Sequence, residues 1–240
     1  MAILPEGEIA RLAQAAPKPR DALGALLRDG VRVIAEVKTA SPSKGVLAPH
    51  LDPVAYAREV EAAGAAVISV LTDERYFHGS FDRLALVRQC VQVPVLCKDF
   101  IVTSWQIKRA RAVGADLVLL IVAALEPAAL GDLLGTTRSL GMEALVEVHD
   151  EEELAVALAA GARIVGVNNR SLQTFEVSLA TSERLAPLFP PGVVRVTESG
   201  ISCRADVERL HGCGYGAFLV GEALVRAPSP GALLRSLSGA

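Results

Sequence analysis

The sequence predicts an α/β protein that folds as a single (β/α)₈ barrel. Short β-branched apolar runs alternate with Ala-, Leu-, Arg- and Glu-rich stretches of helical period along the 240 residues, as in a parallel sheet with crossover helices. The alternation reaches eight strand-and-helix units, the number found in a closed TIM barrel of roughly 250 residues. No Gly-x-Gly-x-x-Gly follows the first strand, which disfavours an open nucleotide-binding sheet.

The predicted strands are apolar at both odd and even positions, as parallel strands are when both of their faces are covered. They span Val33–Lys38, Ala66–Leu71, Val93–Lys98, Leu117–Val122, Glu143–Val148, Ile164–Asn168, Val193–Glu198 and Ala217–Val220. Helical periodicity between them predicts helices over Pro53–Ala63, Phe81–Cys90, Ser104–Val113, Pro127–Ser139, Glu151–Ala160, Ser182–Leu188, Ala205–His211 and Gly231–Leu237. Several helices end at a glycine, which accepts the left-handed backbone that closes a helix.

Residues 1–30 precede the first strand, and we expect them to form a short N-terminal helical cap over one end of the barrel. Helices are predicted near Glu6–Ala15 and Asp21–Arg28, with a proline-containing stretch between them. Residues 31–240 then form the catalytic barrel. No long polar or Ser-rich segment is present to serve as a linker, so one domain is expected.

Composition excludes several classes of function. The formal net charge is −3, from 24 basic and 27 acidic residues, whereas binding to nucleic acid or an anionic membrane needs a concentrated basic surface. No apolar run reaches the ~20 residues of a bilayer-spanning helix, and no signal peptide is recognisable, so a cytoplasmic location is expected. The four cysteines form no CxxC pair and no histidine cluster completes a zinc pattern, so we expect reduced thiols and no metal.

Polar residues stand at the ends of five predicted strands: Glu36 with Lys38, then Lys98, Glu147, Asn168 and Glu198. The carboxyl ends of barrel strands surround the active site, and isolated buried charges are costly. These residues are therefore expected to converge on one mouth and perform acid–base chemistry on a small polar substrate. A lysine among apolar neighbours also suits Schiff-base formation, and the residues alone leave both readings open.

The loops after the last two strands predict a phosphate site, because such loops offer backbone N–H groups to phosphates in barrel enzymes. Ser199 and Gly200 follow the seventh strand, and Gly221 and Glu222 follow the eighth, where a short helix begins. The loop after the first strand, Ser41-Pro42-Ser43-Lys44-Gly45, adds hydroxyl and cationic donors to the same mouth.

Several of these segments together resemble the indole-3-glycerol-phosphate synthase family, in order and over about residues 20 to 226. The two most specific are IAEVKTASPSKG (Ile34–Gly45) and GVNNRSLQTFEV (Gly166–Val177). The others are VLTDERYFHGS (Val70–Ser80), PVLCKDFIV (Pro94–Val102), ALVEVHDEEEL (Ala144–Leu154), ESGI (Glu198–Ile201) and FLVGEALV (Phe218–Val225).

The resemblance implies the substrate 1-(2-carboxyphenylamino)-1-deoxyribulose 5-phosphate. It implies ring closure with loss of carbon dioxide and water, giving indole-3-glycerol phosphate in tryptophan biosynthesis, without a cofactor. The implied partners are this phosphorylated small molecule and, as a further hypothesis, other tryptophan-pathway enzymes.

The resemblance also implies a role for each matched residue. Lys98 is similar to the general acid on the ribulose carbonyl, and Glu147 to its partner in the later dehydration. Glu36 and Lys38 resemble catalytic and substrate-anchoring residues. The implied orienting residues are Asn168 and Glu198, with Arg170 near the anthranilate end. The implied ring walls are Phe100, Leu119, Ile121 and Leu172. The implied phosphate shell is Ser41, Ser199, Gly200, Gly221 and the backbone N–H of Glu222.

The chain departs from the family pattern in its N-terminal cap. The N-terminal extension is shorter than usual, which predicts a reduced substrate-covering helix, and Ala22 stands where a phenylalanine is usual. We expect both departures to alter the cap and, through it, the affinity for the substrate. Away from the cap, His78 and His149 are expected to be surface or capping residues, and Trp105 and Cys97 to pack.

Three alternatives compete with the synthase hypothesis. A Schiff-base aldolase built on Lys98 predicts an adduct that borohydride traps, whereas the synthase predicts none. Phosphoribosylanthranilate isomerase shares phosphate binding but lacks the EVKxASPSKG loop. A degenerate barrel that only binds phosphorylated ligands is disfavoured, because every acid–base residue is present.

Overall fold

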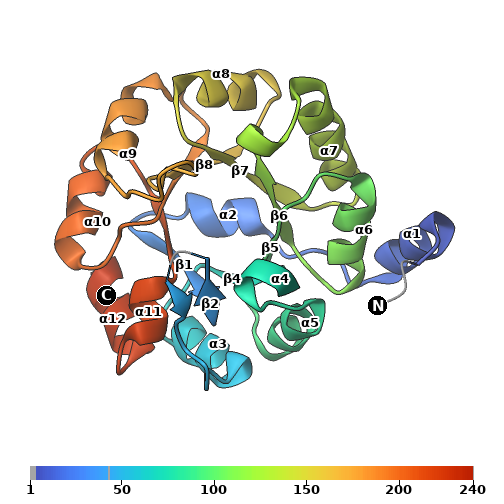
Figure 1. The fold of residues 1–240 in the computed structure, drawn as a ribbon, viewed down its shortest axis with the longest axis horizontal. Coiled ribbons are helices and arrows are strands. Elements are labelled where there is room, and N and C mark those ends of the chain that lie inside the picture. The colour runs from blue at the N-terminus through green and yellow to red at the C-terminus, as the bar shows by residue number, and fades with distance from the viewer. Residues whose placement is uncertain (1–3, 43, 240) are drawn as a thin grey trace.

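The computed structural model describes residues 4–42 and 44–239, so Ser43 of the predicted donor loop lies outside the described residues. Eight parallel strands close into a barrel in the order β1-β10-β9-β8-β7-β6-β5-β4 (Figure 1). The strands are β1 (Arg32–Val37), β4 (Val67–Leu71), β5 (Val95–Lys98), β6 (Leu117–Ile121), β7 (Glu143–Val148), β8 (Ile164–Asn168), β9 (Val194–Glu198) and β10 (Ala217–Val220). The predicted TIM barrel is thus confirmed.

Each of the eight predicted strands is present, and their bounds differ from the prediction by at most two residues. Lys38 lies just beyond β1 rather than in it. β5 begins at Val95 rather than Val93, because Pro94 has no N–H to give to a ladder and the Val95 N–H donates to the Asp116 carboxylate at 2.8 Å.

Helices surround the barrel on its outside (Figure 1). In chain order they are α3 (Pro53–Ala62), α5 (Phe81–Cys90), α6 (Ser104–Ala112), α7 (Pro127–Ser139), α8 (Glu151–Ala159), α9 (Ala180–Leu185), α10 (Arg204–His211) and α12 (Pro230–Ser238). The helix predicted over Ser182–Leu188 begins two residues earlier and becomes a 3₁₀ turn, η2 (Ala186–Leu188). Pro187 explains the change, since its ring removes a helical hydrogen-bond donor.

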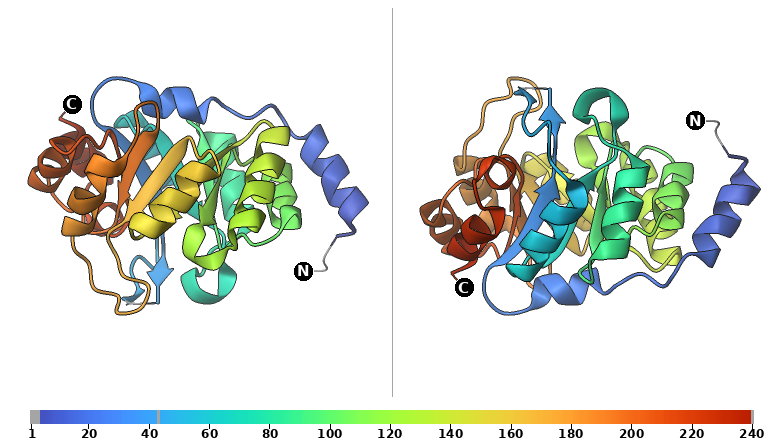
Figure 2. Two further views of the ribbon diagram at one scale, coloured as in Figure 1. Left: turned by 90° about the horizontal axis from the view of Figure 1, so that it is seen from above. Right: turned by 90° about the horizontal axis from the view of Figure 1, so that it is seen from below.

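Four short elements lie in the loops that follow strands. A two-stranded hairpin, β2 (Ala40–Ser41) with β3 (Gly45–Val46), projects from the loop after β1. The helix α4 (Glu74–Phe77) follows β4, and the 3₁₀ turn η1 (Val122–Ala124) follows β6. The short helix expected after β10 is α11 (Glu222–Arg226). The hairpin stands at one end of the barrel and α2 (Ala22–Leu27) at the opposite end (Figure 2).

The N-terminal segment therefore divides into two parts. Ala22 and Leu26 of α2 are buried against residues at the beginnings of the strands, among them Ile34 and Leu96. Helix α1 (Glu6–Ala15) packs outside the barrel on α6, where the Trp105 indole N–H donates to the Leu4 carbonyl. Neither helix lies at the end of the barrel that carries the loops after the strands, so the expected link between the cap and substrate affinity has no contact to support it.

The core has two layers that alternate along each strand. Ile34, Leu145 and Val196 fill the barrel interior, whereas Ala35, Val146 and Phe218 face the surrounding helices. The same alternation carries Glu36 into the interior two residues after Ile34. The predicted packing role of Cys97 is confirmed, since this residue lies in the outer layer and is fully buried.

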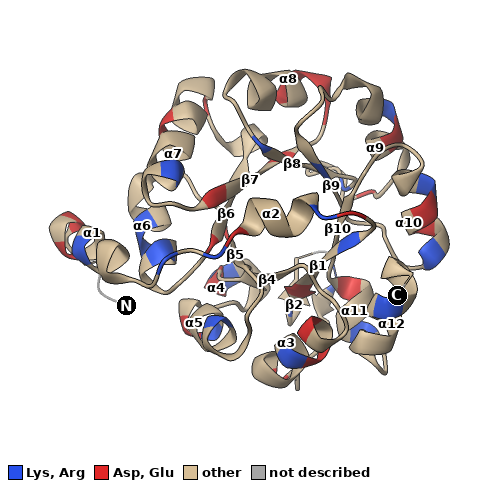
Figure 3. Ribbon diagram, turned by 180° about the vertical axis from the view of Figure 1, so that it is seen from behind, with Lys and Arg blue, Asp and Glu red and all other residues tan. Residues whose placement is uncertain are grey.

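The outer surface carries charges of both signs. Seen from behind, basic and acidic residues are mixed over the outer helices and neither gathers into one large patch (Figure 3). Within residues 4–42 and 44–239, none of the helices is both long enough and apolar enough to span a bilayer.

Candidate active site

The loop-bearing end of the barrel holds a cavity of about 420 Å³. The predicted site residues that line this cavity are Glu36, Lys38, Ser41, Lys98, Phe100, Leu119, Ile121, Glu147, Asn168, Arg170, Leu172, Glu198, Ser199, Gly200, Gly221 and Glu222. Lys44, the cation expected from the loop after β1, is exposed and does not line it. They come from the carboxyl ends of β1, β5, β6, β7, β8, β9 and β10 and from the loops that follow. Parallel strands deliver their ends to one rim, which is why residues distant in sequence meet here.

A lysine between two glutamates lies at the centre of the site. The Lys98 ammonium donates to Glu147 Oε2 at 3.2 Å and to Glu198 Oε2 at 3.1 Å. The lysine side chain is 14% exposed, and the two glutamates are 3% and 2% exposed. The three groups come from β5, β7 and β9, so they meet only because the barrel closes.

Burial and charge act on the pKa of each member of this triad. Burial by itself lowers the pKa of Lys98, but the adjacent Glu198 and Glu147 outweigh it and the net pKa is raised. Burial raises the pKa of Glu198 to about 7, despite the opposing effect of Lys98. Burial also acts to raise the pKa of Glu147, yet Lys98, His149 and the Asn168 amide together lower it. At neutral pH the lysine is therefore cationic and Glu147 is ionised.

Asn168 links this triad to the loop after β9. Its amide nitrogen donates to Glu147 Oε1 at 3.1 Å, and its oxygen accepts from the Ser199 hydroxyl at 2.9 Å and the Arg170 backbone N–H at 3.0 Å. Both ends of the amide are engaged, which sets its orientation. Ser199 is one of the few non-glycine residues with a positive φ, at 65°.

A second ion pair lies beside the triad, and two glycines without side chains leave space for the carboxylates of both. Lys38 Nζ is 3.3 Å from Glu36 Oε1. A Cβ on Gly221 would stand 2.5 Å from that same Glu36 oxygen, and a Cβ on Gly166 would stand 2.3 Å from Glu198 Oε1. Both contacts are too short for any side chain, so these two glycines are required for the carboxylates to sit where they do.

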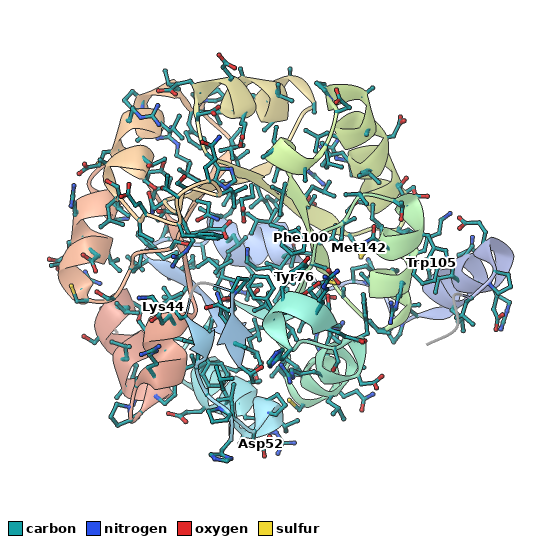
Figure 4. The ribbon with its side chains drawn as sticks, in the orientation of Figure 1. Lys44, Asp52, Tyr76, Phe100, Trp105 and Met142 are labelled. Atoms are coloured by element: carbon teal, nitrogen blue, oxygen red, sulfur yellow. The ribbon has the colours of Figure 1, made fainter. Side chains whose placement is uncertain are left out.

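One wall of the cavity is apolar. Phe100 and Leu172 are 45% and 47% exposed, while Leu119 and Ile121 are nearly buried. Figure 4 shows Phe100 and Tyr76 near the centre of the barrel end. Exposed aromatic and aliphatic groups that face a cavity form a surface for a flat apolar ligand.

Sequence reasoning missed three aromatic residues of this wall: Tyr76, Phe77 and Phe175. Tyr76 and Phe77 belong to α4, whose N-cap is Asp73, and the Phe77 and Phe100 ring centroids are 6.1 Å apart. The Lys38 ammonium stands 5.4 Å from the Phe77 ring centroid. The sequence motif around Tyr76 was recognised, but its aromatic pair was given no role. The signal that could have revealed it is Asp73, a helix-capping residue three positions before the pair.

The expected anion end of the cavity contains Ser41, Ser199, Gly200, Gly221 and Glu222. Ser41 lies in the hairpin and is 7% exposed. The Glu222 carboxylate is 3.4 Å from the Arg226 guanidinium one turn along α11. A carboxylate has no hydrogen to donate, so Glu222 can offer an anion only its backbone N–H.

A buried polar cluster behind the cavity also escaped prediction. The Asn169 amide donates to Thr197 Oγ1 and to the Glu198 carbonyl, each at 3.0 Å, and its oxygen accepts from the Ser182 hydroxyl at 2.8 Å. Its amide also donates to the Ser199 carbonyl at 3.1 Å. Asn169 thereby ties the ends of β8 and β9 together, and the adjacent Asn168 was the only one of the pair that the sequence marked.

Of the two histidines beside motifs, one is placed as expected and the other is not. His78 is exposed and caps α4 with a left-handed backbone, φ 53°. The expectation for His149 is wrong: its side chain is 13% exposed and its Nε2 lies 3.5 Å from Glu147 Oε1. His149 has the same strand parity as Glu147, so it turns toward the same side at the end of β7.

Taken together, the fold and the site define a class: a (β/α)₈-barrel enzyme with a buried acid–base centre at the carboxyl ends of its strands. Among the described residues, no cluster of three or more His, Cys, Asp or Glu side chains is arranged to hold a metal ion. The indole-3-glycerol phosphate synthase profile matches residues 5–237, and the chain belongs to that family.

Curated relatives agree with this family assignment, and a solved structure agrees with the fold. An indole-3-glycerol phosphate synthase from Kineococcus radiotolerans is 58% identical over 221 residues, 92% of this chain and 79% of the relative. One from Mycobacterium avium is 52% identical over 236 residues, 98% of this chain and 87% of the relative. The 3-hexulose-6-phosphate synthase structure from Salmonella typhimurium superposes with a TM-score of 0.71 at 12% identity, covering 87% of this chain and 97% of that one, and shows the fold alone.

The activity implied by the sequence motifs is thereby confirmed. The chain is an enzyme of tryptophan biosynthesis, a lyase that closes a ring with loss of carbon dioxide.

Proposed function

We propose that Lys98 is the general acid of the ring closure and that Glu147 handles the proton of the dehydration. The observation that carries this proposal is the placement of Lys98 between Glu147 and Glu198, at 3.2 and 3.1 Å, on the wall of the cavity. Two buried carboxylates keep the lysine protonated, and a protonated lysine can give a proton to a carbonyl oxygen but cannot attack the carbonyl.

The substrate's own chemistry fixes where protons must move. A new bond joins the ribulose ketone carbon to the ring carbon that bears the carboxylate, and the ketone oxygen takes a proton, from Lys98 in this proposal. Loss of the carboxylate as carbon dioxide returns an electron pair to the ring. The hydroxyl made from the ketone then takes up a second proton, from Lys98 reprotonated by solvent, and leaves as water, while the Glu147 carboxylate removes a proton from the methylene carbon next to the nitrogen. Lys98 on β5 is the acid and Glu147 on β7 is the base, and only β6 separates these two strands in the barrel.

The two ends of the substrate fit the two ends of the cavity. The apolar wall of Phe100, Leu119, Ile121 and Leu172 takes the aromatic ring, with Arg170 and Lys38 as the cations for its carboxylate. The phosphate takes the opposite end, with Ser41, Ser199, Gly200, Gly221 and the Glu222 N–H as its shell. Holding both ends restricts the chain between them, and such preorganisation is worth up to ~7–11 kcal/mol in intramolecular reactions.

Orienting roles fall to the groups that touch the triad. Asn168 connects Glu147 with Ser199, and Glu198 holds the other side of the Lys98 ammonium. Glu36 pairs with Lys38 at the end of β1 and, through that pair, sets the position of the Lys38 cation. These contacts support a positioning role for Asn168, Glu198 and Glu36: they hold the acid and the anion-binding groups in place and transfer no proton themselves.

The Schiff-base alternative is disfavoured by the same geometry. Imine formation requires an unprotonated amine, which enzymes obtain by placing the lysine among apolar groups or other cations. Lys98 instead has two carboxylates in contact and a raised pKa. Borohydride trapping with the substrate is therefore expected to give no adduct, and a stable adduct at Lys98 would reverse this choice.

The test of the proposal is indole fluorescence after mixing the protein with 1-(2-carboxyphenylamino)-1-deoxyribulose 5-phosphate in the presence of EDTA. Growth of the indole signal is expected, together with its abolition in Glu147→Gln and Lys98→Met. Full activity in either variant would remove that residue from the mechanism. Dependence on added metal would contradict the cofactor-free reaction.

The phosphorylated substrate fits the family, and two further expectations belong with this proposal. A cytoplasmic site of action is expected to appear as diffuse fluorescence of a tagged chain in its host. Association with other tryptophan-pathway enzymes is expected to appear as their co-purification after cross-linking in cells. Recovery of the chain in a membrane fraction, or without those enzymes, would contradict the respective expectation.

A further inference from the structure

His149 approaches the Glu147 oxygen that Lys98 does not contact. Its Nε2 lies 3.5 Å from Glu147 Oε1, and its Nδ1 lies 2.9 Å from Glu153 Oε2. The same Glu153 oxygen accepts the His149 backbone N–H at 2.8 Å, which fixes the histidine at the junction of β7 and α8. His149 does not line the cavity among the described residues, so it acts on the reaction only through Glu147.

Both ring nitrogens of His149 face carboxylates, and this decides its protonation state. A neutral imidazole carries one N–H, so whichever tautomer forms, one bare nitrogen must face a negatively charged oxygen. Only the imidazolium has an N–H on both nitrogens. The arrangement of Glu153, His149 and Glu147 in a row therefore favours the charged form on geometry alone.

The carboxylates around His149 also raise its pKa. Glu147 faces it from β7, Glu153 from α8 and, at longer range, Glu198 from β9. Burial by itself lowers the pKa of His149, but these three carboxylates outweigh burial and raise it above the usual histidine value. Lys98 contacts the other oxygen of Glu147, Oε2, at 3.2 Å.

We propose that His149 is a positioning residue that, as an imidazolium, keeps Glu147 ionised and in place when Lys98 gives up its proton. The inference rests on the roles proposed for Lys98 and Glu147. Five charged side chains form the acid–base centre: the cations Lys38 and Lys98 and the carboxylates Glu36, Glu147 and Glu198. When Lys98 becomes neutral, Glu147 and Glu198 lose their shared cation. His149 then provides the remaining positive charge in contact with Glu147.

The charge on His149 is measured directly by NMR titration of the histidine side chains of the active enzyme. The chain has four histidines, and loss of one signal in His149→Asn assigns the resonance. We expect His149 to titrate above the ~6.5 of an ordinary histidine. In Glu153→Gln, which keeps an acceptor for Nδ1 but removes its charge, we expect the His149 midpoint to fall by about half a pH unit or more. A wild-type midpoint at or below the ordinary value, or no shift in Glu153→Gln, would overturn the proposal.

Steady-state kinetics test the consequence for turnover. His149→Asn is expected to lower kcat on the order of tenfold and to leave KM within about twofold, because the residue touches Glu147 and not the cavity. The alkaline fall of kcat is expected to begin at lower pH in Glu153→Gln than in the wild type. The matched control is His50→Asn, an exposed position away from Glu147, where no change is expected.

The outcomes separate this inference from the proposed function. An unchanged kcat and pH profile in both His149→Asn and Glu153→Gln, with the wild type active, would refute the role of His149 alone. An inactive wild type would refute the proposed function, while the titration would still report the charge on His149. Equal loss of kcat and of folded protein in His149→Asn would indicate a structural role, and Glu153→Gln, which retains the hydrogen bonds, then decides the matter.

Discussion

Replacing Lys98 by methionine is the sharpest test of the acid–base centre. Methionine is close to lysine in length, so the change removes the charge and the proton without leaving a large cavity. Loss of one general acid typically costs 10²–10⁴-fold in rate, or about 3–5 kcal/mol of transition-state stabilisation. The expected result for Lys98→Met is a fall of kcat by at least about 100-fold.

The same variant is expected to change the pH dependence of stability. Lys98 lies 3.2 Å from Glu147 and 3.1 Å from Glu198, both almost fully buried. Without it, the buried Glu198 carboxylate loses its neighbouring cation and resists ionisation in the fold, whereas Glu147 keeps the His149 imidazolium. Leaving buried charges unpaired costs about 3–5 kcal/mol, and this cost is present at high pH and relieved as the pH falls and the acids are protonated.

Turnover is measured by indole fluorescence, and stability by urea unfolding at pH 5 and pH 8. Lys108→Met is the matched control, because Lys108 lies on α6 outside the cavity and pairs with Glu6. Lys98→Met with kcat within fivefold of the wild type would refute the role of Lys98 as general acid. A stability loss equal at both pH values would refute the electrostatic account of the triad.

Three further changes have definite expected outcomes. The pKa of Glu198 rises from 4.5 to about 7 on folding, so relative to Glu198→Gln the wild type should lose about 3 kcal/mol of unfolding free energy as the pH rises across that window. Gly166→Ala should displace the Glu198 carboxylate and sharply lower kcat, whereas Gly131→Ala, with open space around it in α7, should be neutral or slightly stabilising. Ala22→Phe should lower the free energy of unfolding by about 1–3 kcal/mol, because it overpacks the barrel interior at the beginnings of the strands, and it should leave KM unchanged. A raised KM in Ala22→Phe would mean that α2 communicates with the substrate.

Much of the fold was predictable because barrel strands are short, apolar on both faces and separated by helices of regular period. Each of the eight strands was found within two residues of its bounds. The errors occur where backbone chemistry interrupts a periodic pattern, as at Pro94 before β5 and Pro187 in η2. The hairpin after β1 and the helix α4 carry too few residues for periodicity to reveal them.

The acid–base residues were predictable for a related reason. Glu36, Lys98, Glu147 and Glu198 are charged residues that end otherwise apolar runs, and such a break in a buried strand is visible in the sequence alone. Phe77 and His149 show no such break, since each lies in a loop or just after a strand. Their contacts with Phe100 and Glu147 depend on how neighbouring segments turn.

By itself, the sequence determined the alternation of strands and helices, the barrel class, the family and the polar residues that end the strands. These depend on periodicity and local composition, which are properties of the chain. Only the tertiary structure decided which distant charges meet: Lys98 contacts Glu147 and Glu198 across 49 and 100 positions of sequence. The physical reason is that the strength of a charge contact depends on distance and burial, and both are set by barrel closure rather than by sequence separation.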